Sequence, residues 1–106
     1  MADSHTTEHT PARATVQLDT DFTRVTEWYF TPGTHTTFHV HEWDYVVVPT
    51  VPGTMTIETA DEVFDNPIEL GASYTRSAGS AHDVRNDTDS DFAFVEIEFK
   101  GRGIPT

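Results

Sequence analysis

The sequence lacks cysteine altogether, and Lys100 is its only lysine. Without thiols no disulfide can form, and any bound metal must be held by nitrogen and oxygen atoms. The chain has six lysine and arginine residues and 18 aspartate and glutamate residues, which gives a net charge of −12. This balance argues against nucleic acid as a partner, because phosphate binding needs a basic face. No apolar run approaches the roughly 20 residues of a membrane span, and the first ten residues contain no arginine or lysine. We therefore expect a soluble, cytoplasmic protein without membrane contacts.

Hydrophobic residues make up 36% of the chain and aromatic residues 11%, which is typical of a globular protein. A chain of 106 residues has room for one domain with a single modest core. We predict a flexible N-terminal tail over residues 1–11, one domain over residues 12–100 and a C-terminal tail over residues 101–106.

Short β-prone runs separated by turn residues recur along the chain, and no segment shows a helical period. Strands at intervals of roughly 8–12 residues are typical of an all-β sandwich or barrel. Because Val46, Val47 and Val48 are apolar on both faces, we expect their strand to be buried on both sides. The predicted strands cover residues 14–18, 22–31, 36–41, 45–50, 54–59, 63–64, 68–70, 73–76, 82–86 and 92–100.

Two histidines, His39 and His41, lie one residue apart in the predicted strand 36–41. Side chains two apart on a strand point to the same face. Paired imidazoles are a common way to hold a transition-metal ion. The alternative is that the two histidines lie on an exposed strand and have no function.

Two spaced motifs resemble those of the cupin family over about residues 23–100. The first has five residues between Gly33 and His39 and one residue before His41. The second keeps the family's spacings, with serine in place of the usual proline, at Gly71, Ser77, Gly79, His82 and Asn86. The resemblance implies a small cupin, a double-stranded β-helix or jelly-roll barrel, which commonly forms a homodimer through its barrel edges.

The resemblance also implies that His39, His41 and His82 bind one divalent metal ion inside the barrel. Such a set of neutral nitrogen ligands suits iron(II), our first expectation, as well as nickel, manganese, copper or zinc. The ion would keep open positions for water or substrate. The other interpretation is that the histidines only form hydrogen bonds in a polar interior.

The family's usual fourth ligand, a glutamate, is replaced here by Tyr45. If the strand is regular, Tyr45 points toward the metal, whereas Glu42 and Asp44 point away. Its hydroxyl could then ligate the metal or act as an acid or base, and some cupin lyases that cleave dimethylsulfoniopropionate have a similar tyrosine. Alternatively, Tyr45 is an aromatic wall residue with a hydrogen-bonded hydroxyl.

Three further residues are candidates for the site. Arg76 suits a substrate carboxylate if it faces the interior, but it can equally face solvent. Glu96 shares a face of the last strand with Phe92 and Phe94, so it could enter the cavity as a base or as a support for the site; alternatively it is solvated. Trp43 could line a pocket, although aromatic residues in small barrels usually belong to the core.

The resemblance leaves several functions open, each with a small molecule as the partner. One is a metal-dependent enzyme on a small polar or carboxylate metabolite, similar to cupin dioxygenases, or a lyase or isomerase with the metal as Lewis acid. The run from His41 to Pro49 also resembles short cupins linked to β-alanine degradation. The alternatives are a sensor or carrier that binds a ligand or metal without turnover, and a structural cupin that has lost its chemistry.

Overall fold

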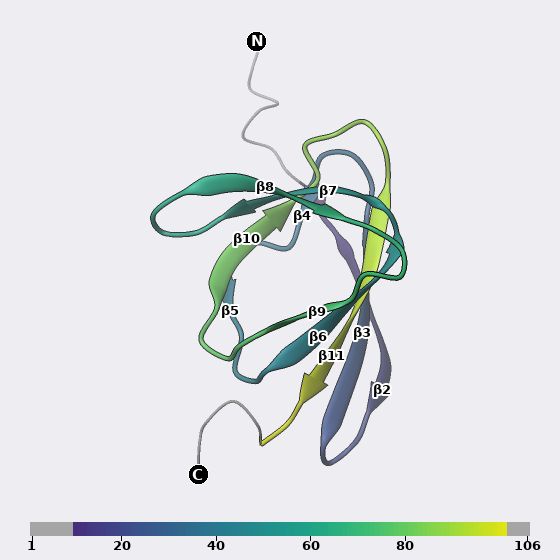
Figure 1. The fold of residues 1–106 in the computed structure, drawn as a ribbon, viewed down its shortest axis with the longest axis vertical. Coiled ribbons are helices and arrows are strands. Elements are labelled where there is room, and N and C mark those ends of the chain that lie inside the picture. Colours follow the sequence, from purple (N-terminus) through teal and green to yellow (C-terminus); the bar gives the residue numbers. More distant parts are fainter. Residues whose placement is uncertain (1–9, 102–106) are drawn as a thin grey trace.

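The computed structural model of the chain describes residues 10–101, which form eleven short strands and no helix. The strands form two sheets that face each other across a common interior (Figure 1). The predicted all-β class is confirmed. Within residues 10–101 no helix is long and apolar enough to cross a membrane.

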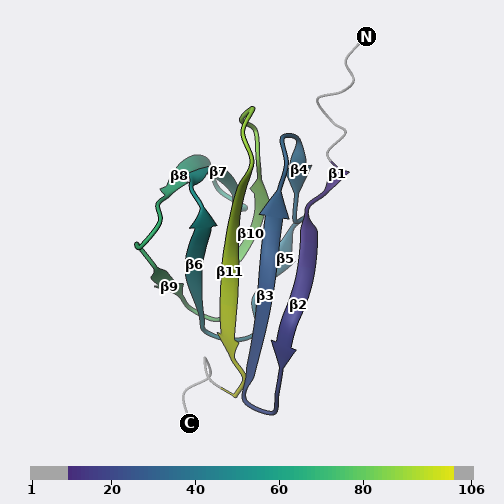
Figure 2. The same ribbon diagram turned by 90° about the vertical axis from the view of Figure 1, so that its right-hand side faces the viewer.

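The first sheet has five antiparallel strands in the order β2-β3-β11-β6-β9. Figure 2 shows β2, β3, β11 and β6 side by side, with β9 at the edge. Its strands are β2 (Arg13–Asp19), β3 (Thr23–Phe30), β11 (Phe92–Phe99), β6 (Tyr45–Val51) and β9 (Tyr74–Arg76).

The second sheet has the order β1-β4-β10-β7-β8, and β5 pairs with β10 beside this path. Its short parallel pair joins β1 to β4. Two residues of the predicted N-terminal tail thus form a strand, and residues 1–9 lie outside the described part of the chain. The strands are β1 (Thr10–Pro11), β4 (Thr34–His35), β5 (His39–Val40), β7 (Gly53–Glu58), β8 (Val63–Ile68) and β10 (Ala81–Arg85).

The apolar core fills the interior between the two sheets. Phe30 of β3 stacks on Phe92 of β11, with ring centroids 4.7 Å apart, and Phe94 packs beside them. Val47 is buried, but Val46 and Val48 are partly exposed on the outer face of the sheet. The expectation that this strand is buried on both sides is therefore wrong, because no layer among the described residues covers that face.

Of the predicted strand 36–41, only β5 (His39–Val40) forms, and β4 (Thr34–His35) lies before the predicted start. Thr37 interrupts the predicted strand with a φ of 76°, in the left-handed region that β-branched residues rarely adopt. By contrast, the runs predicted at residues 63–64 and 68–70 join into the single strand β8, although Pro67 lies within it. Because β8 lies at the edge of its sheet, a proline is tolerated there.

Asn86, the last residue of the second motif, is fully buried just after β10. Its side-chain amide donates hydrogen bonds to the carbonyls of Phe30 and Ser90 at 3.1 and 2.8 Å. Its side-chain oxygen accepts from the backbone and hydroxyl of Thr88. One side chain thus ties the end of β3 to the loop before β11.

Asn86→Ala should lower the free energy of unfolding by about 2–4 kcal/mol, because it removes these bonds and leaves buried carbonyls without a donor. Urea unfolding would measure the loss. Asp89→Ala, an exposed change in the same loop, is the control and should stay within about 0.5 kcal/mol of the wild type. An Asn86→Ala variant as stable as this control would contradict the assignment.

Candidate metal centre

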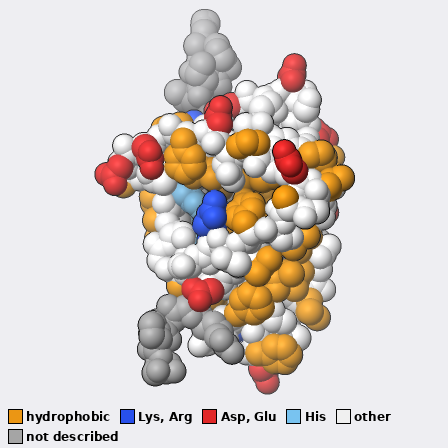
Figure 3. Space-filling view, in the orientation of Figure 1, with side chains coloured by type: hydrophobic (Ala, Val, Ile, Leu, Met, Phe, Trp, Pro, Cys, Tyr) orange, Lys and Arg blue, Asp and Glu red, His pale blue; other side chains and the backbone are white. Residues whose placement is uncertain are grey.

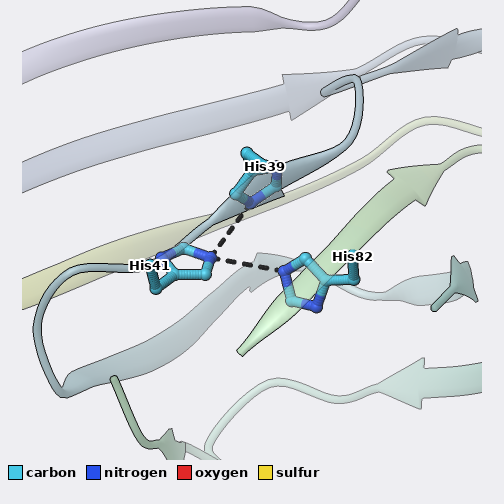
Figure 4. Close-up of side chains that lie close together, drawn as sticks. All are labelled: His39, His41 and His82. Atoms are coloured by element: carbon cyan, nitrogen blue, oxygen red, sulfur yellow. Dashed lines mark hydrogen bonds between the residues drawn. The ribbon is translucent and has the colours of Figure 1, made fainter. Parts of the chain in front are cut away.

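Three histidines meet at the edge of the second sheet (Figure 4). His39 on β5 lies directly opposite His82 on β10 in the antiparallel register. His41 follows β5, and its backbone is fixed by two hydrogen bonds. Its N–H donates to the carbonyl of Ser80 at 2.9 Å, and its carbonyl accepts from the N–H of Gly79 at 2.8 Å. The pairing of β5 with β10 and the hydrogen bonds of His41 therefore bring the two sequence motifs together.

The Nε2 atoms of the three rings converge. The Nε2 of His41 lies 3.0 Å from that of His39 and 3.3 Å from that of His82. Two imidazole nitrogens bound to one ion at about 2.1 Å, at angles of about 90–110°, are about 3.0–3.4 Å apart. One proton on the Nε2 of His41 cannot satisfy both facing lone pairs, whereas a cation can. Two of the three separations thus match those around a bound ion, and all three candidate ligand atoms lie within 4.8 Å of one another, so this donor set fits a metal ion.

Burial keeps the rings of His41 and His82 neutral. Desolvation, together with the neighbouring His39 and His82, lowers the pKa of His41 to about 3. Desolvation also lowers the pKa of His82 to about 4, with contributions from His39 and Arg76. Since metal binding requires an unprotonated nitrogen, these two ligands are ready at neutral pH.

The ring of His39 is oriented by Thr37, two residues earlier, whose backbone is in the left-handed region. Its Nδ1 lies 2.9 Å from the carbonyl of Thr37, and the hydroxyl of Thr36 donates to the same carbonyl. An N–H at Nδ1 that donates to this carbonyl leaves Nε2 as the ligand atom. The left-handed conformation of Thr37 thus contributes to the site, and we know of no pattern in the sequence that predicts it.

Tyr45 lies beside the site, 2% exposed. Its ring stacks on that of His41, with centroids 4.0 Å apart and planes inclined by 25°. Burial and the nearby Glu96 raise its pKa, against a smaller effect from Arg76. The phenol therefore keeps its proton at neutral pH and forms part of the wall next to His41.

The chain between His41 and Tyr45 is not a regular strand, so the parity argument for the two acids does not apply. Residues 42 and 43 form a bend. Glu42 lines the groove beside the histidines. Asp44 accepts a hydrogen bond from the backbone N–H of Ala78 at 2.9 Å. Asp44 thus joins the loop of the first motif to that of the second, a role that the sequence analysis missed.

Glu96 points inward from β11 and is 9% exposed, on the face that its alternation with Phe92 and Phe94 indicates. Burial and the charge of Glu98 raise its pKa to about 7, partly offset by a hydrogen bond with Trp28. Among the described residues, this side chain lines both spaces next to the histidines. A carboxyl group that titrates near neutral pH can either give or take a proton.

Two spaces adjoin the histidines. An open groove of about 620 Å³ is lined by His39 and His41 together with Trp28 and Trp43. Trp43 has the guanidinium of Arg24 at 5.2 Å from its ring centroid. The second space, a small inner cavity, has about 20 Å³, enough for about one water molecule. Its lining includes His82, Tyr45, Arg76 and Glu96. The inner cavity is too small for molecules larger than water, so such molecules reach the histidines through the open groove.

Comparison with known proteins agrees with this arrangement. The beta-alanine degradation protein BauB of Pseudomonas aeruginosa is 44% identical over 86 residues, which cover 81% of this chain and 90% of BauB. The crystal structure of a cupin domain from Bordetella pertussis is also 44% identical, with a TM-score of 0.86 over 89% of this chain and 98% of that one. This chain belongs to the cupin superfamily.

More distant cupins share the fold alone. The DMSP lyase DddQ of Ruegeria pomeroyi superposes with a TM-score of 0.69 at 13% identity, over 90% of this chain and 50% of that one. No protein-family model matches the sequence. The predicted cupin fold, a double-stranded β-helix, is confirmed by the structural likeness.

The buried carboxyl of Glu96 should make the stability of this cupin depend on pH. The folded pKa of about 7 lies above the ordinary value of 4.5, so the stabilisation is complete below pH 4.5 and declines as pH rises to 7. The lowered pKa values of His41 and His82 act in the opposite direction over the same pH range, so the test is the difference in unfolding free energy between Glu96→Gln and the wild type. This difference should shift by about 3 kcal/mol in favour of the variant as pH rises. Urea unfolding of metal-free protein between pH 4.5 and 7.5 measures it. Glu69→Gln, an exposed change, is the control, and identical pH profiles for both variants would contradict the assignment.

Proposed function

We propose that this cupin is a mononuclear metal-dependent enzyme whose ion is held by His39, His41 and His82. The observation that carries the proposal is the convergence of three Nε2 atoms, two of which, those of His41 and His82, belong to rings that burial keeps neutral. Iron(II) is the metal that we favour, with nickel, manganese, copper or zinc as alternatives. When bound, such an ion supplies Lewis acidity and open coordination positions for a small polar molecule.

The surrounding residues support acid–base chemistry at this site. The raised pKa of Glu96 lies near neutral pH, and the side chain is buried beside Trp28 in the wall of the groove. The groove that contains Trp28 and Trp43 also contains His39 and His41, so a molecule in this groove meets the ligand residues and Glu96 together. Tyr45 keeps its hydroxyl proton and closes the wall behind His41.

Two reaction classes follow from this arrangement. A dioxygenase-like reaction fits three neutral ligands, which leave positions for both substrate and oxygen. A lyase or isomerase reaction is favoured by Glu96, a group able to exchange a proton with a substrate beside a Lewis acid. The similarity to a protein named for beta-alanine degradation supports a small polar metabolite as the substrate. A carrier or sensor without turnover is the remaining alternative.

The metal-loaded protein should consume oxygen or convert at least one member of a panel of small polar metabolites. His82→Ala should reduce this activity at least about 100-fold, because two imidazoles hold an ion much less tightly than three. The matched control is His35→Ala, since the ring of His35 lies 3.1 Å from Asp83 and outside the cluster. Activity that survives His82→Ala would contradict the metal mechanism, and binding without turnover would favour the carrier.

A further inference from the structure

Most basic side chains of the described residues already have acidic partners. Arg24 lies near Asp19 and Glu98, Arg85 near Glu58 and Asp87, and Lys100 near Asp19. Within residues 10–101, two arginines are without a carboxylate at ion-pair distance, and each lies over a tyrosine ring instead. They are Arg13 over Tyr29 and Arg76 over Tyr74. In a chain of net charge −12, an arginine without an acidic partner is unexpected.

The two arginines differ in position. Arg13 lies on β2, at the outer edge of its sheet. Arg76 lies on β9 directly opposite Tyr45 in the register, and Tyr45 is buried in the interior. Arg76 therefore starts from the interior face of β9. It lines the inner cavity together with His82, and its charge contributes to the lowered pKa of that histidine.

The guanidinium of Arg76 lies where solvent and the metal site meet. It lines an outer cleft of about 570 Å³ as well as the inner cavity. In the space-filling view a basic side chain lies beside a histidine in the middle of this face (Figure 3). A ligand in the outer cleft can therefore contact Arg76 while one small group enters the cavity next to His82.

Arg76 is an exposed residue, and its guanidinium contacts Tyr74 and Thr75 on its own strand. Its guanidinium carbon lies 4.5 Å from the centroid of the Tyr74 ring, and the hydroxyl of Tyr74 accepts a hydrogen bond from the amide of Asn66 at 3.3 Å. One N–H of Arg76 donates to the carbonyl of Thr75 at 3.0 Å. A guanidinium has five N–H donors, so others remain to bind a planar acceptor.

We propose that Arg76 binds the carboxylate of a small monocarboxylate substrate, an inference that rests on the metal-dependent function proposed above. A guanidinium binds a carboxylate through two parallel hydrogen bonds. A monoanion matches the charge of Arg76, since Lys100, the other cation of this cleft, is paired with Asp19. Asp44 in the same cleft repels an anion of higher charge, such as phosphate, more strongly than a monoanion. Carboxylate binding at Arg76 places the rest of the substrate beside Tyr45 in the outer cleft, and the inner cavity next to His82 has room for a group about the size of a water molecule.

Calorimetric titration of the nickel-loaded protein with propionate tests this subsite. Arg76→Gln should weaken propionate binding about 10- to 100-fold, the usual effect of losing a charged, bidentate hydrogen bond. Arg76→Lys should recover only part of the affinity, because an ammonium group lacks the planar fork. Propionamide, which has a similar shape and no charge, should bind equally to the wild type and Arg76→Gln.

Arg13→Gln is the matched control, since it removes an arginine that also lies over a tyrosine and has no ion pair within the described residues. It should bind propionate like the wild type. Equal propionate affinity in Arg76→Gln and the wild type, or no propionate binding in the wild type, would overturn the inference.

A second titration separates this inference from the proposed function. Metal content is measured for each protein, and the titration is repeated after treatment with a chelator. Binding that depends on Arg76 in a protein unable to take up metal would support the carboxylate subsite and contradict the metal-dependent function. Full metal uptake with no effect of Arg76→Gln would leave the metal function standing and remove the subsite.

Discussion

The candidate site depends on the antiparallel pairing of β5 with β10. This short ladder sets His39 opposite His82, although the two residues are 43 positions apart in the sequence. The backbone bonds between His41 and the turn at Gly79 and Ser80 extend the same contact by a few residues. Asp44 adds a side-chain bond to Ala78 in that turn. The geometry of the three ring nitrogens is thus set by backbone hydrogen bonds.

Burial gives the site its chemical character. The same low-polarity surroundings that lower the pKa of His41 and His82 raise the pKa of Glu96. His41 and His82 are therefore neutral at a pH where the carboxyl group of Glu96 is still partly protonated. A set of neutral ligands beside an acid that titrates near pH 7 is a combination that solvent-exposed residues of the same types would not provide.

Alternation along the strands made much of this arrangement predictable. It indicated the all-β fold and the common face of His39 and His41, and it left the inward position of Glu96 beside Phe94 as one of two alternatives. The pairing of His82 with the other two came from motif spacing, because nothing local links residues so distant in sequence. The break at Thr37 was not predictable, since its left-handed conformation is imposed by the surrounding structure.

The contacts that side chains make with residues on other strands were also not predictable from the sequence. The position of Arg76 follows from its register with Tyr45 and from the ring of Tyr74, neither of which local pattern reveals. The partial exposure of Val46 and Val48 shows a second limit of sequence-based prediction, which here predicted more burial than the structure has. An apolar run indicates that both faces avoid water, but only the tertiary structure shows whether a second layer covers each face.

The central claim is that three histidines hold one transition-metal ion, and elemental analysis of protein purified without a histidine tag tests it most directly. We expect about one iron, nickel, manganese, copper or zinc ion per chain, and its loss in His39→Ala. X-ray absorption of the loaded protein should show imidazole nitrogens at about 2.1 Å from the ion. A wild-type protein that contains no metal and takes none up on reconstitution would contradict the account.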